Sequence, residues 1–527
     1  MHKSLIDFSK TGFFFKLILD YLAGAESVRP FYHYAPSLES FASAIKDKQK
    51  ELINRPVLVE VLKEQHLKLP NAIASLQQID LLLQPNTYTV TTGHQLCLFT
   101  GPLYFLYKII TTINLADALN KAYPGNHFVP VYWMASEDHD FEEVSRVNIF
   151  GKKIVWKQEQ KGVTGKIATD SLKNVLEELK PIMGSSENAL KLFDIFEQAY
   201  AKPTLAMASA YLVHALFGQY GLLIIDGDDV RLKSEFKNII KDDILNATNY
   251  KLVNSCIQKL AEQNIKAQVN PREINCFYKT EGLRERIEKK DEHYHIVNTD
   301  IHFTEVEILT ELENHPDRFS PNVVLRPLYQ EKILPNVASI GGPGELAYWM
   351  EYKSMFEHHH INFPILMLRN CLLWIESTIH ERILKLNIHN EELFLPIEEQ
   401  IKIFLNKQGS DISFTHEEKQ LKDLYEIIKT KAEKIDPTLK GTVEAELQKQ
   451  LNILKTIESK LLKAEKQKQE VNINQLKKIK DKLFPEGHLQ ERHDNFIPFF
   501  IKHGDAFITE LKEHLNPFEK QLVVLSE

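Results

Sequence analysis

The chain has 527 residues, of which 43% are hydrophobic and 26% charged, and its formal net charge at pH 7 is -8. This length and composition allow two or three buried cores, and the net acidity argues against a general nucleic-acid binder. The chain has four cysteines, at Cys97, Cys256, Cys276 and Cys371. No two of them form a Cys-x-x-Cys pair, so they fit neither a disulfide framework nor a zinc pattern. No uninterrupted apolar run approaches the ~18 residues that a bilayer requires, so we expect a cytoplasmic protein without a membrane span.

The first chemically informative stretch runs from residue 87 to 108, after a region at 1–85 whose apolar spacing is typical of packed helices. It reads as a β-branched strand that ends at Gly93–Gln95. We predict that a helix begins at about Thr100, because threonine is a favoured N-cap residue and Pro102 suits the first turn. The N-terminus of such a helix can bind an anion, although an ordinary strand-to-helix turn is the alternative interpretation.

Two further strands are expected at residues 128–134 and 222–225. Both are continuous apolar runs, which is typical of strands covered on both faces of a parallel sheet. A hairpin-like section at 147–156 and a helical stretch separate them. The alternation of buried strands and helices predicts an α/β fold with a mostly parallel sheet and helices on both of its faces.

Residues 250–320 change character to short strands among charged turns, and we interpret them as an insert in the sheet domain. The sheet pattern then returns, with a strand at 337–340, a loop at Gly341–Gly344 and a helix from Glu345. This loop is not a Walker motif, because Pro343 cannot donate a hydrogen bond and no Lys-Ser/Thr pair follows. It is either a nucleotide-binding loop of another kind or a tight turn.

Near residue 380 the composition shifts to Lys, Glu, Gln, Leu and Ile. Apolar residues recur at spacings of three and four over 421–435 and 447–464, which is characteristic of coiled coils. The break at Asp436-Pro437 predicts an antiparallel hairpin with a longer second arm, whose extra apolar stripe would contact the core or a second copy of the chain. We therefore expect an α/β core at 1–380 with an insert near 250–320, an antiparallel helical coiled coil at 381–484, and a final segment at 485–527 that packs back on the core.

Four polar or glycine clusters follow predicted strands. Right-handed crossovers bring the carboxyl ends of parallel strands to one edge of the sheet, where ligands bind near a topological switch point. We therefore expect one crevice for small acidic molecules. The clusters are Gly93–Gln95, Glu137–Asp140, Asp226–Asp229 and Gly341–Gly344.

The acidic cluster at Glu137–Asp140 could hold a divalent cation or supply a general base. Neighbouring residues of an extended chain point to opposite sides, so at most two of the four can face one ligand. We assign Asp138 and His139 as catalytic candidates and predict no metal site. Arg326 and Arg369 could clamp a carboxylate or phosphate, or pair with a structural acid. The candidates for substrate or nucleotide binding are Gly93, His94, Gln95, Gly101, Lys108, Asp226, Asn322, Arg326, Gly341, Gly342, Gly344, Glu345, Tyr348 and Arg369.

Five motifs occur in this order along the chain, and the similarity they belong to spans nearly its whole length: TGHQLCLFTGPLYFLYK, YWMASEDHDFEEV, FSPNVVLRPLYQEKILP, IGGPGELAYW and LFPEGHLQER. They resemble the bacillithiol biosynthesis cysteine-adding enzyme family, the cysteine ligases. The family pattern commonly has glutamine where His94 stands and glycine where Cys97 stands. Both positions therefore rank lower as functional residues, and no base for a Cys97 nucleophile can be identified.

The resemblance implies a Rossmann-type core with connecting inserts, related to class I aminoacyl-tRNA synthetases, and a coiled coil that pairs two chains. It implies a ligase that joins cysteine to glucosaminyl malate through an amide. Because amide formation from a free carboxylate is uphill in water, some activation is expected, and ATP is the candidate nucleotide. The alternative is a binding or scaffold protein that retains a synthetase-like crevice without turnover. A tRNA-directed activity is disfavoured because the chain is acidic and lacks a basic aromatic surface.

Overall fold

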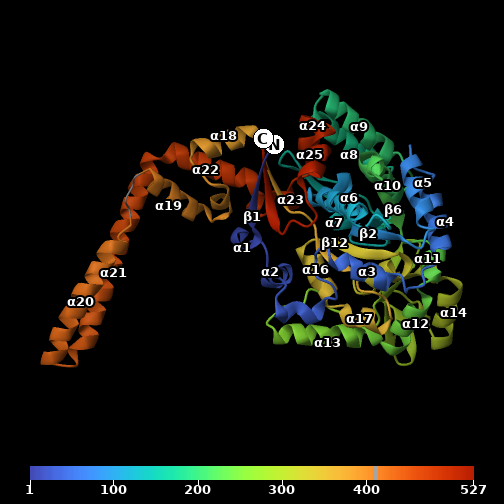
Figure 1. Cartoon of the computed structure of the whole chain (residues 1–527), viewed down its shortest axis with the longest axis horizontal. Coiled ribbons are helices and arrows are strands. Elements are labelled where there is room, and N and C mark those ends of the chain that lie inside the picture. Colours follow the sequence, from blue (N-terminus) through green and yellow to red (C-terminus); the bar gives the residue numbers. More distant parts are fainter. Residues whose placement is uncertain (409–412) are drawn as a thin grey trace.

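The computed structural model describes residues 1–408 and 413–527, and an α/β core and a projecting helical arm make up the molecule (Figure 1). The central sheet of the core has five parallel strands in the order β13-β12-β2-β3-β6. The predicted Rossmann-like class is therefore confirmed. Because the chain runs outward from β2 in one direction and resumes at β12 on the other side, the switch point lies between β2 and β12. The strands are β2 (Thr87–His94), β3 (His127–Met134), β6 (Leu223–Asp226), β12 (Asn336–Gly341) and β13 (Ile365–Leu368).

The sheet is buried on both faces, which explains the continuous apolar runs of its strands. In β6, Leu223 and Ile225 face one hydrophobic core and Ile224 faces another. Helix α4 (Arg55–His66) contributes to the first core, and α6 (Tyr104–Ala122) and α10 (Leu205–Phe217) contribute to the second. Strand β2 is in register with β3, and β3 with β6, so the polar residues that follow them emerge at one edge.

The start of α6 differs from the prediction. The chain first forms a short 3-10 turn at Leu98–Thr100, in which Phe99 and Thr100 have positive φ angles of 48° and 69°. Helix α6 begins at Tyr104, and no side chain caps its N-terminus. Thr100 is therefore not an N-cap residue, because its left-handed backbone is incompatible with the extended conformation that N-caps adopt.

The insert over the strand ends is a second, antiparallel sheet in the order β10-β9-β8-β7-β11. It follows α12 (Lys237–Asn246) and α13 (Thr248–Glu262), and α14 (Glu305–Asn314) connects β10 to the last strand. Its strands are β7 (Cys276–Thr280), β8 (Leu283–Lys290), β9 (His293–Ile296), β10 (His302–Phe303) and β11 (Phe319–Pro321).

A third sheet joins the two ends of the chain and was not expected from the sequence. Strand β15 (Gln521–Ser526) lies between β1 (His2–Asp7), which is antiparallel to it, and β14 (Leu372–Ile375), which is parallel to it. Residues 1–85 are therefore not helical throughout, although helices at 16–23, 40–48, 55–66 and 73–81 follow β1. The final segment also packs on the core through α24 (Ile497–His503), which contacts α9 (Glu187–Tyr200).

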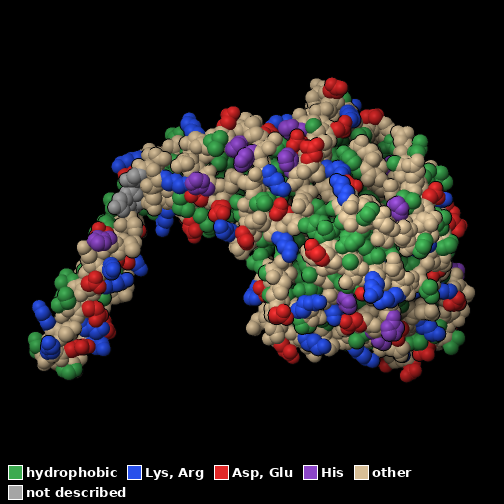
Figure 2. Space-filling view, in the orientation of Figure 1, with side chains coloured by type: hydrophobic (Ala, Val, Ile, Leu, Met, Phe, Trp, Pro, Cys, Tyr) green, Lys and Arg blue, Asp and Glu red, His purple; other side chains and the backbone are tan. Residues whose placement is uncertain are grey.

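The arm is an antiparallel hairpin of α20 (Thr415–Ile435) and the longer α21 (Leu439–Lys468). Its turn falls at Asp436, as the sequence predicted. Figure 2 shows hydrophobic side chains at the surface of the arm among charged ones. None of the helices in residues 1–408 and 413–527 has the length and apolarity to cross a membrane.

The remaining elements support the core and the base of the arm. They are α2 (Lys16–Ala23), α3 (Ser40–Lys48), α5 (Ile73–Leu81), α7 (Phe141–Val144), the hairpin β4 (Arg146–Ile149) and β5 (Lys152–Val155), α8 (Leu172–Met183), α11 (Val230–Ser234), α15 (Leu325–Ile333), α16 (Pro343–Met350), α17 (Lys353–His358), α18 (Ser377–Lys385), α19 (Ile397–Lys407), α22 (Glu470–Leu483), α23 (Gln490–His493) and α25 (Ala506–His514).

Candidate active site

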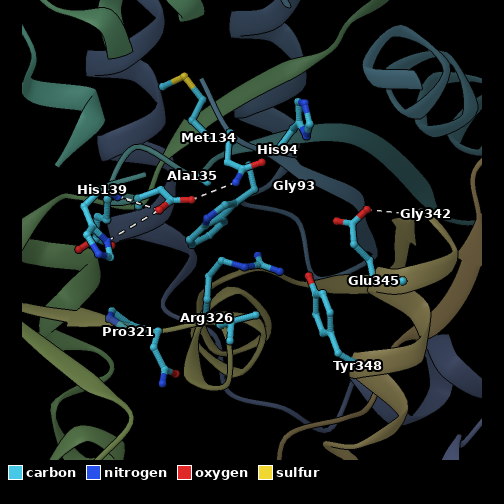
Figure 3. Close-up of a pocket in the computed structure, with 18 of the residues that line it drawn as sticks. Gly93, His94, Met134, Ala135, His139, Pro321, Arg326, Gly342, Glu345 and Tyr348 are labelled. Atoms are coloured by element: carbon cyan, nitrogen blue, oxygen red, sulfur yellow. Dashed lines mark hydrogen bonds and ion pairs between the residues drawn. The ribbon is translucent and has the colours of Figure 1, made fainter. Parts of the chain in front are cut away.

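A cavity of about 620 Å³ lies at the carboxyl ends of the central strands, beneath the insert (Figure 3). Residues that follow β2, β3 and β12 line one side of it, and residues from β7, β8 and the start of α15 line the other. It therefore occupies the switch-point crevice of the sheet. The sequence candidates that line it are Gly93, His94, Gln95, Lys108, Asp138, His139, Asn322, Arg326, Gly342, Gly344, Glu345, Tyr348 and Arg369.

Three sequence candidates lie elsewhere. Gly101 belongs to the turn before α6, and its carbonyl accepts a hydrogen bond from Asn495 at 2.6 Å. Gly341 is buried at the end of β12 and packs against α16. Asp226 faces a smaller cavity of about 320 Å³, where Ser136 Oγ donates a 2.5 Å hydrogen bond to it. Burial, and then a neighbouring carboxylate, raise the pKa of Asp226. The geometry gives none of these three a contact with a ligand in the larger cavity.

Asp138 is held in a fixed orientation at the end of β3. Its Oδ1 accepts the backbone N–H groups of His139 at 2.7 Å and Asp140 at 3.2 Å, and its Oδ2 accepts a 3.1 Å hydrogen bond from Gln95 Nε2. The same amide group of Gln95 donates to Glu143 at 2.6 Å. Gln95 therefore positions the carboxylate of Asp138 at the cavity wall.

His139 is bound to an arginine of the insert. Arg284 Nη1 donates to His139 Nδ1 at 2.6 Å, while its other nitrogens donate to Ser320 Oγ and the carbonyl of Pro321, and its guanidinium lies over the Phe277 ring. Burial, followed by the charge of Arg284, lowers the pKa of His139. Because a guanidinium only donates, the neutral ring carries its proton on Nε2. While this contact stands, His139 is a hydrogen-bond donor toward the cavity and not a base.

The N-terminus of α16 already holds a carboxylate. Glu345 Oε2 accepts the backbone N–H of Gly342 at 2.8 Å and forms a 2.5 Å ion pair with Lys108 Nζ. Lys108 also donates to the carbonyl of Gly93, which connects the ends of β2 and β12 across the switch point. Burial lowers the pKa of Lys108, and the ion pair with Glu345 opposes that shift.

Arg369 contributes an unpaired donor to the cavity. Its Nη2 donates to Glu491 at 2.6 Å and its Nη1 to the carbonyl of Asn370, and both charged side chains are almost fully buried. Its Nε is also buried but has no hydrogen-bond partner among the residues that the structure describes, and it lies beside Gly342 at the start of α16. An unpaired guanidinium N–H beside a helix N-terminus is a suitable contact for an oxyanion.

Figure 3 shows Arg326 in the middle of the cavity, with His139 on one side and Glu345 and Tyr348 on the other. Arg326 Nη1 donates to Gln330 at 3.1 Å, one turn along α15. Asn322 also lines the cavity, but its Oδ1 accepts two backbone N–H groups near the start of α15. Its side chain is therefore used mainly to position that helix.

His94 and Cys97 are packing residues in this structure. The His94 ring stacks on Phe105, with 4.9 Å between centroids, and burial lowers its pKa well below the usual value. Cys97 Sγ lies 3.8 Å from His94 Nε2, and burial raises the pKa of the Cys97 thiol to about 12. A buried thiol with so high a pKa is a poor nucleophile.

A buried ion-pair network separates the two cavities. Lys233 is fully buried and donates to both carboxylate oxygens of Glu137, at 2.6 and 2.8 Å. Lys279 on β7 pairs with Asp228 and lies 3.7 Å from Glu137. These contacts attach the insert to the strand ends and leave Asp228 on the side of the smaller cavity. The acidic cluster Asp226–Asp229, which follows β6, is thus part of the wall of the smaller cavity.

Four arginines that line the cavity were not predicted. Arg284 and Arg286 occupy alternate positions of β8, and Arg272 precedes β7. The alternation of arginines in Leu283–Lys290 is visible in the sequence and could have indicated one cationic strand face. Arg492, on α23, comes from the far end of the chain, and no local pattern connects it to the cavity.

Fold and site together define a class of protein: a Rossmann-like α/β protein with an insert over its strand ends and an arginine-rich cavity for small molecules at its switch point. Residues 1–370 match the family model for "Bacillithiol biosynthesis BshC, N-terminal Rossmann-like domain". Residues 372–527 match "Bacillithiol biosynthesis BshC, C-terminal coiled-coil domain". The chain belongs to this bacillithiol biosynthesis BshC family.

Bacterial relatives are similar over their whole length. A protein of Flavobacterium psychrophilum is 43% identical over 524 residues, which cover 98% of each chain. Proteins of Christiangramia forsetii and Flavobacterium johnsoniae are each 41% identical and cover 100% of this chain and 99% and 100% of their own. All three carry the name "Putative cysteine ligase BshC".

Proposed function

We propose that the protein is a carbon–nitrogen ligase that joins the carboxyl group of cysteine to the amino group of glucosaminyl malate. The observation that carries this proposal is the convergence of Arg272, Arg284, Arg286, Arg326, Arg369 and Arg492 on one cavity of about 620 Å³. Arginine recognises carboxylates through parallel hydrogen bonds, and both substrates carry carboxylates. The volume is within the range of small-molecule sites.

Arg369 and Arg326 are the proposed contacts for substrate oxyanions. The unpaired Nε of Arg369 lies beside the α16 N-terminus, where backbone amides and the helix dipole also favour negative charge. Arg326 lies between this point and His139. An oxyanion near Arg369 would thus share one cavity with the candidate catalytic residues.

Asp138 is the proposed base for the attacking amine. In the amide-forming step the amine nitrogen attacks the activated carbonyl carbon, the leaving group departs with its electron pair, and the amine proton passes to a carboxylate oxygen of Asp138. His139, whose Nδ1 accepts from Arg284, would donate from Nε2 to the carbonyl oxygen as negative charge develops on it. The two candidates thereby take different roles.

Formation of an amide from a free carboxylate is unfavourable in water, so we propose ATP as the source of activation. ATP would supply the leaving group on the cysteine carboxyl. The first backbone amides of a helix have no intrahelical acceptor, and those of α16 lie at the cavity together with Arg369. Pro343, the first residue of α16, has no N–H, and the Glu345 carboxylate occupies the N–H of the N-cap residue Gly342, so the site offers fewer phosphate contacts than a phosphate-binding loop.

The test is product formation by purified full-length protein with cysteine and glucosaminyl malate, with and without ATP. We expect bacillithiol to form only with ATP, and Asp138→Asn to lower the rate about 10²- to 10⁴-fold because it removes the base. Glu142→Gln, a change in the exposed carboxylate of α7, is the matched control and should keep the rate. Equal rates in Asp138→Asn and the control would overturn the assignment of the base. Substrate binding without turnover by the wild type would favour the scaffold alternative.

A further inference from the structure

A second group of functional side chains lies on the core away from the cavity. Asp242 of α12 and His358 and His359, at the end of α17, bring one possible ligand atom each to within 4.8 Å of one another. In Figure 1, α12, α13 and α17 lie together at the lower edge of the core. Neither cavity described above is lined by any of the three side chains.

Asp242 presents a carboxylate oxygen without a partner. Its Oδ1 accepts a 2.7 Å hydrogen bond from Asn246 Nδ2, one turn along α12. Its Oδ2 is buried and has no hydrogen-bond partner among the described residues. A buried carboxylate oxygen is costly unless it is paired, and a bound cation can supply the missing partner of such an atom. The fixed Oδ1 leaves Oδ2 free to bind a cation.

A hydrogen-bond chain determines which nitrogen of His359 can bind a metal. Asn249 is fully buried, and its Nδ2 donates to Asp243 Oδ1 at 3.0 Å, so its Oδ1 is the acceptor. His359 Nε2 lies 2.9 Å from this Asn249 Oδ1 and must donate to it. In the neutral ring the lone pair is then on Nδ1. A ring nitrogen oriented through a hydrogen bond on the opposite nitrogen is the usual arrangement of a metal-binding histidine.

We propose that Asp242, His358 and His359 bind a divalent transition-metal ion, with Zn²⁺ as the best match. Two imidazoles and one carboxylate are ligands that zinc prefers, whereas Mg²⁺ and Ca²⁺ prefer oxygen ligands alone. A tetrahedral zinc with bonds of about 2.0–2.1 Å brings its ligand atoms to ~3.4 Å from one another, and exposed His358 can rotate toward such a position. The ion would connect α12 to the end of α17, with water as the fourth ligand.

A competing histidine cluster must be distinguished in the test. His293, His295 and His302 lie on β9 and β10 with ring centroids 5.9–6.4 Å apart. Their ligand atoms do not converge as those of the proposed site do, since only the Asp242 group meets that criterion within the described part of the chain. His302→Gln and His360→Gln, the latter a change in the residue next to the site, are therefore the control variants.

The experiment uses untagged full-length protein freed of metal by a chelator. Zn²⁺ affinity is measured by competition with a chromophoric chelator, and Co²⁺ is used as a probe of coordination through its visible absorbance. We expect one Zn²⁺ per chain, a rise in melting temperature with Zn²⁺, and binding weakened at least about 10-fold in Asp242→Asn and His359→Gln. The two control variants should bind as the wild type does.

The proposal is overturned if the wild type binds no stoichiometric Zn²⁺. In that case a water molecule, and not a metal ion, would be the partner of Asp242 Oδ2. It is also overturned if His302→Gln or His360→Gln abolishes binding while Asp242→Asn keeps it. Melting temperatures of the metal-free variants identify any folding defect. A variant that melts like the metal-free wild type but gains no stability from Zn²⁺ supports the site.

Discussion

The core and the arm use apolar residues in different ways. In α6 of the core, 13 of 19 residues are buried, and the two cores on either side of the sheet are complete within one chain. In the arm, α20 has no buried residue, and Leu451 is the buried residue of the 30-residue α21. The same helical spacing of leucine and isoleucine thus gives a packed interior in one region and an exposed stripe in the other. Spacing predicts the helix, but long-range contacts decide whether its stripe is covered.

The core and the arm also differ in the burial of their charged residues. The core buries Arg369 with Glu491 and Lys233 with Glu137, and each pair is completed by further hydrogen bonds. Ion pairs of the arm, such as Lys429–Glu444, lie at the surface. Desolvation makes a buried pair costly to break, and solvent makes an exposed one nearly neutral. Matched substitutions in the two regions should therefore have very different effects.

The largest effect is expected from Glu491→Gln. This change keeps the shape of the side chain but leaves the Arg369 guanidinium buried without its counter-charge. We expect the free energy of unfolding to fall by about 3–5 kcal/mol, the range for a buried ion pair with one partner removed. Denaturant unfolding of wild type and variant would measure it. A loss below about 1 kcal/mol would contradict this expectation, because the buried Arg369–Glu491 pair would then contribute no more to stability than an exposed ion pair does.

The next effect depends on pH and comes from Glu331, which is fully buried in α15. Its Oε1 accepts hydrogen bonds from Gln330 and Asn336, but its Oε2 has no hydrogen-bond partner in residues 1–408 and 413–527. Burial raises the pKa of Glu331 from 4.5 to about 7. Because the folded pKa is raised, the contribution of Glu331 to stability is fully present below about pH 4.5 and is lost as the pH rises through 7.

Glu331→Gln removes this ionisation and should be compared with the wild type at pH 5 and pH 8. We expect the variant to gain on the order of 3 kcal/mol relative to the wild type between these two pH values, since one pKa unit corresponds to about 1.4 kcal/mol. Thermal or denaturant unfolding at each pH gives the difference. Parallel stability curves for the two proteins would show that Glu331 is not the responsible group.

Much of the central sheet was predictable because its strands carry their own signal. Continuous apolar runs at 128–134 and 222–225 reflect burial on both faces, and both strands are present. The sheet formed by β1, β14 and β15 was not predictable, since its pairing joins residues about five hundred positions apart. Strand β14 also follows β13 after a gap of only three residues, so no helical segment separated the two in the sequence.

The site was predictable where strands end and not where the insert contacts them. Gly93 lies near the end of β2, Asp138 lies in the loop after β3, and Gly342 directly follows β12, so topology brings them to one cavity. Arg284 belongs to a separate antiparallel sheet, whose placement over the strand ends depends on contacts such as the ion pair of Lys279 on β7 with Asp228. Nothing local in the sequence indicates that placement.

The arm should associate with a second copy of the chain, and we predict a homodimer. Ile453 and Ile457, one turn apart on α21, are 51% and 42% exposed. Apolar side chains at coiled-coil spacing gain about 1.5–3 kcal/mol each when fully buried. Replacing both with lysine should shift light scattering from two copies of the 61.1 kDa chain to one. Lys455→Glu, a change on the opposite side of α21, is the control and should leave the mass unchanged. A monomeric wild type would contradict the prediction.

The smallest effect is expected from Glu444→Gln, the arm counterpart of Glu491→Gln. Glu444 forms a 2.9 Å ion pair with Lys429, but its side chain is 52% exposed, and Lys429 has a second partner in Glu426 at 3.3 Å. Solvent and salt screen such a pair, so we expect no measurable change in melting temperature or molecular mass. The melting temperatures of the variant and the wild type should be compared at low and at high salt, because any residual effect of an exposed ion pair must disappear at high salt. A loss of stability that persists at high salt would mean that Glu444 is buried against another surface, and the dimer contact would then include this side of the arm.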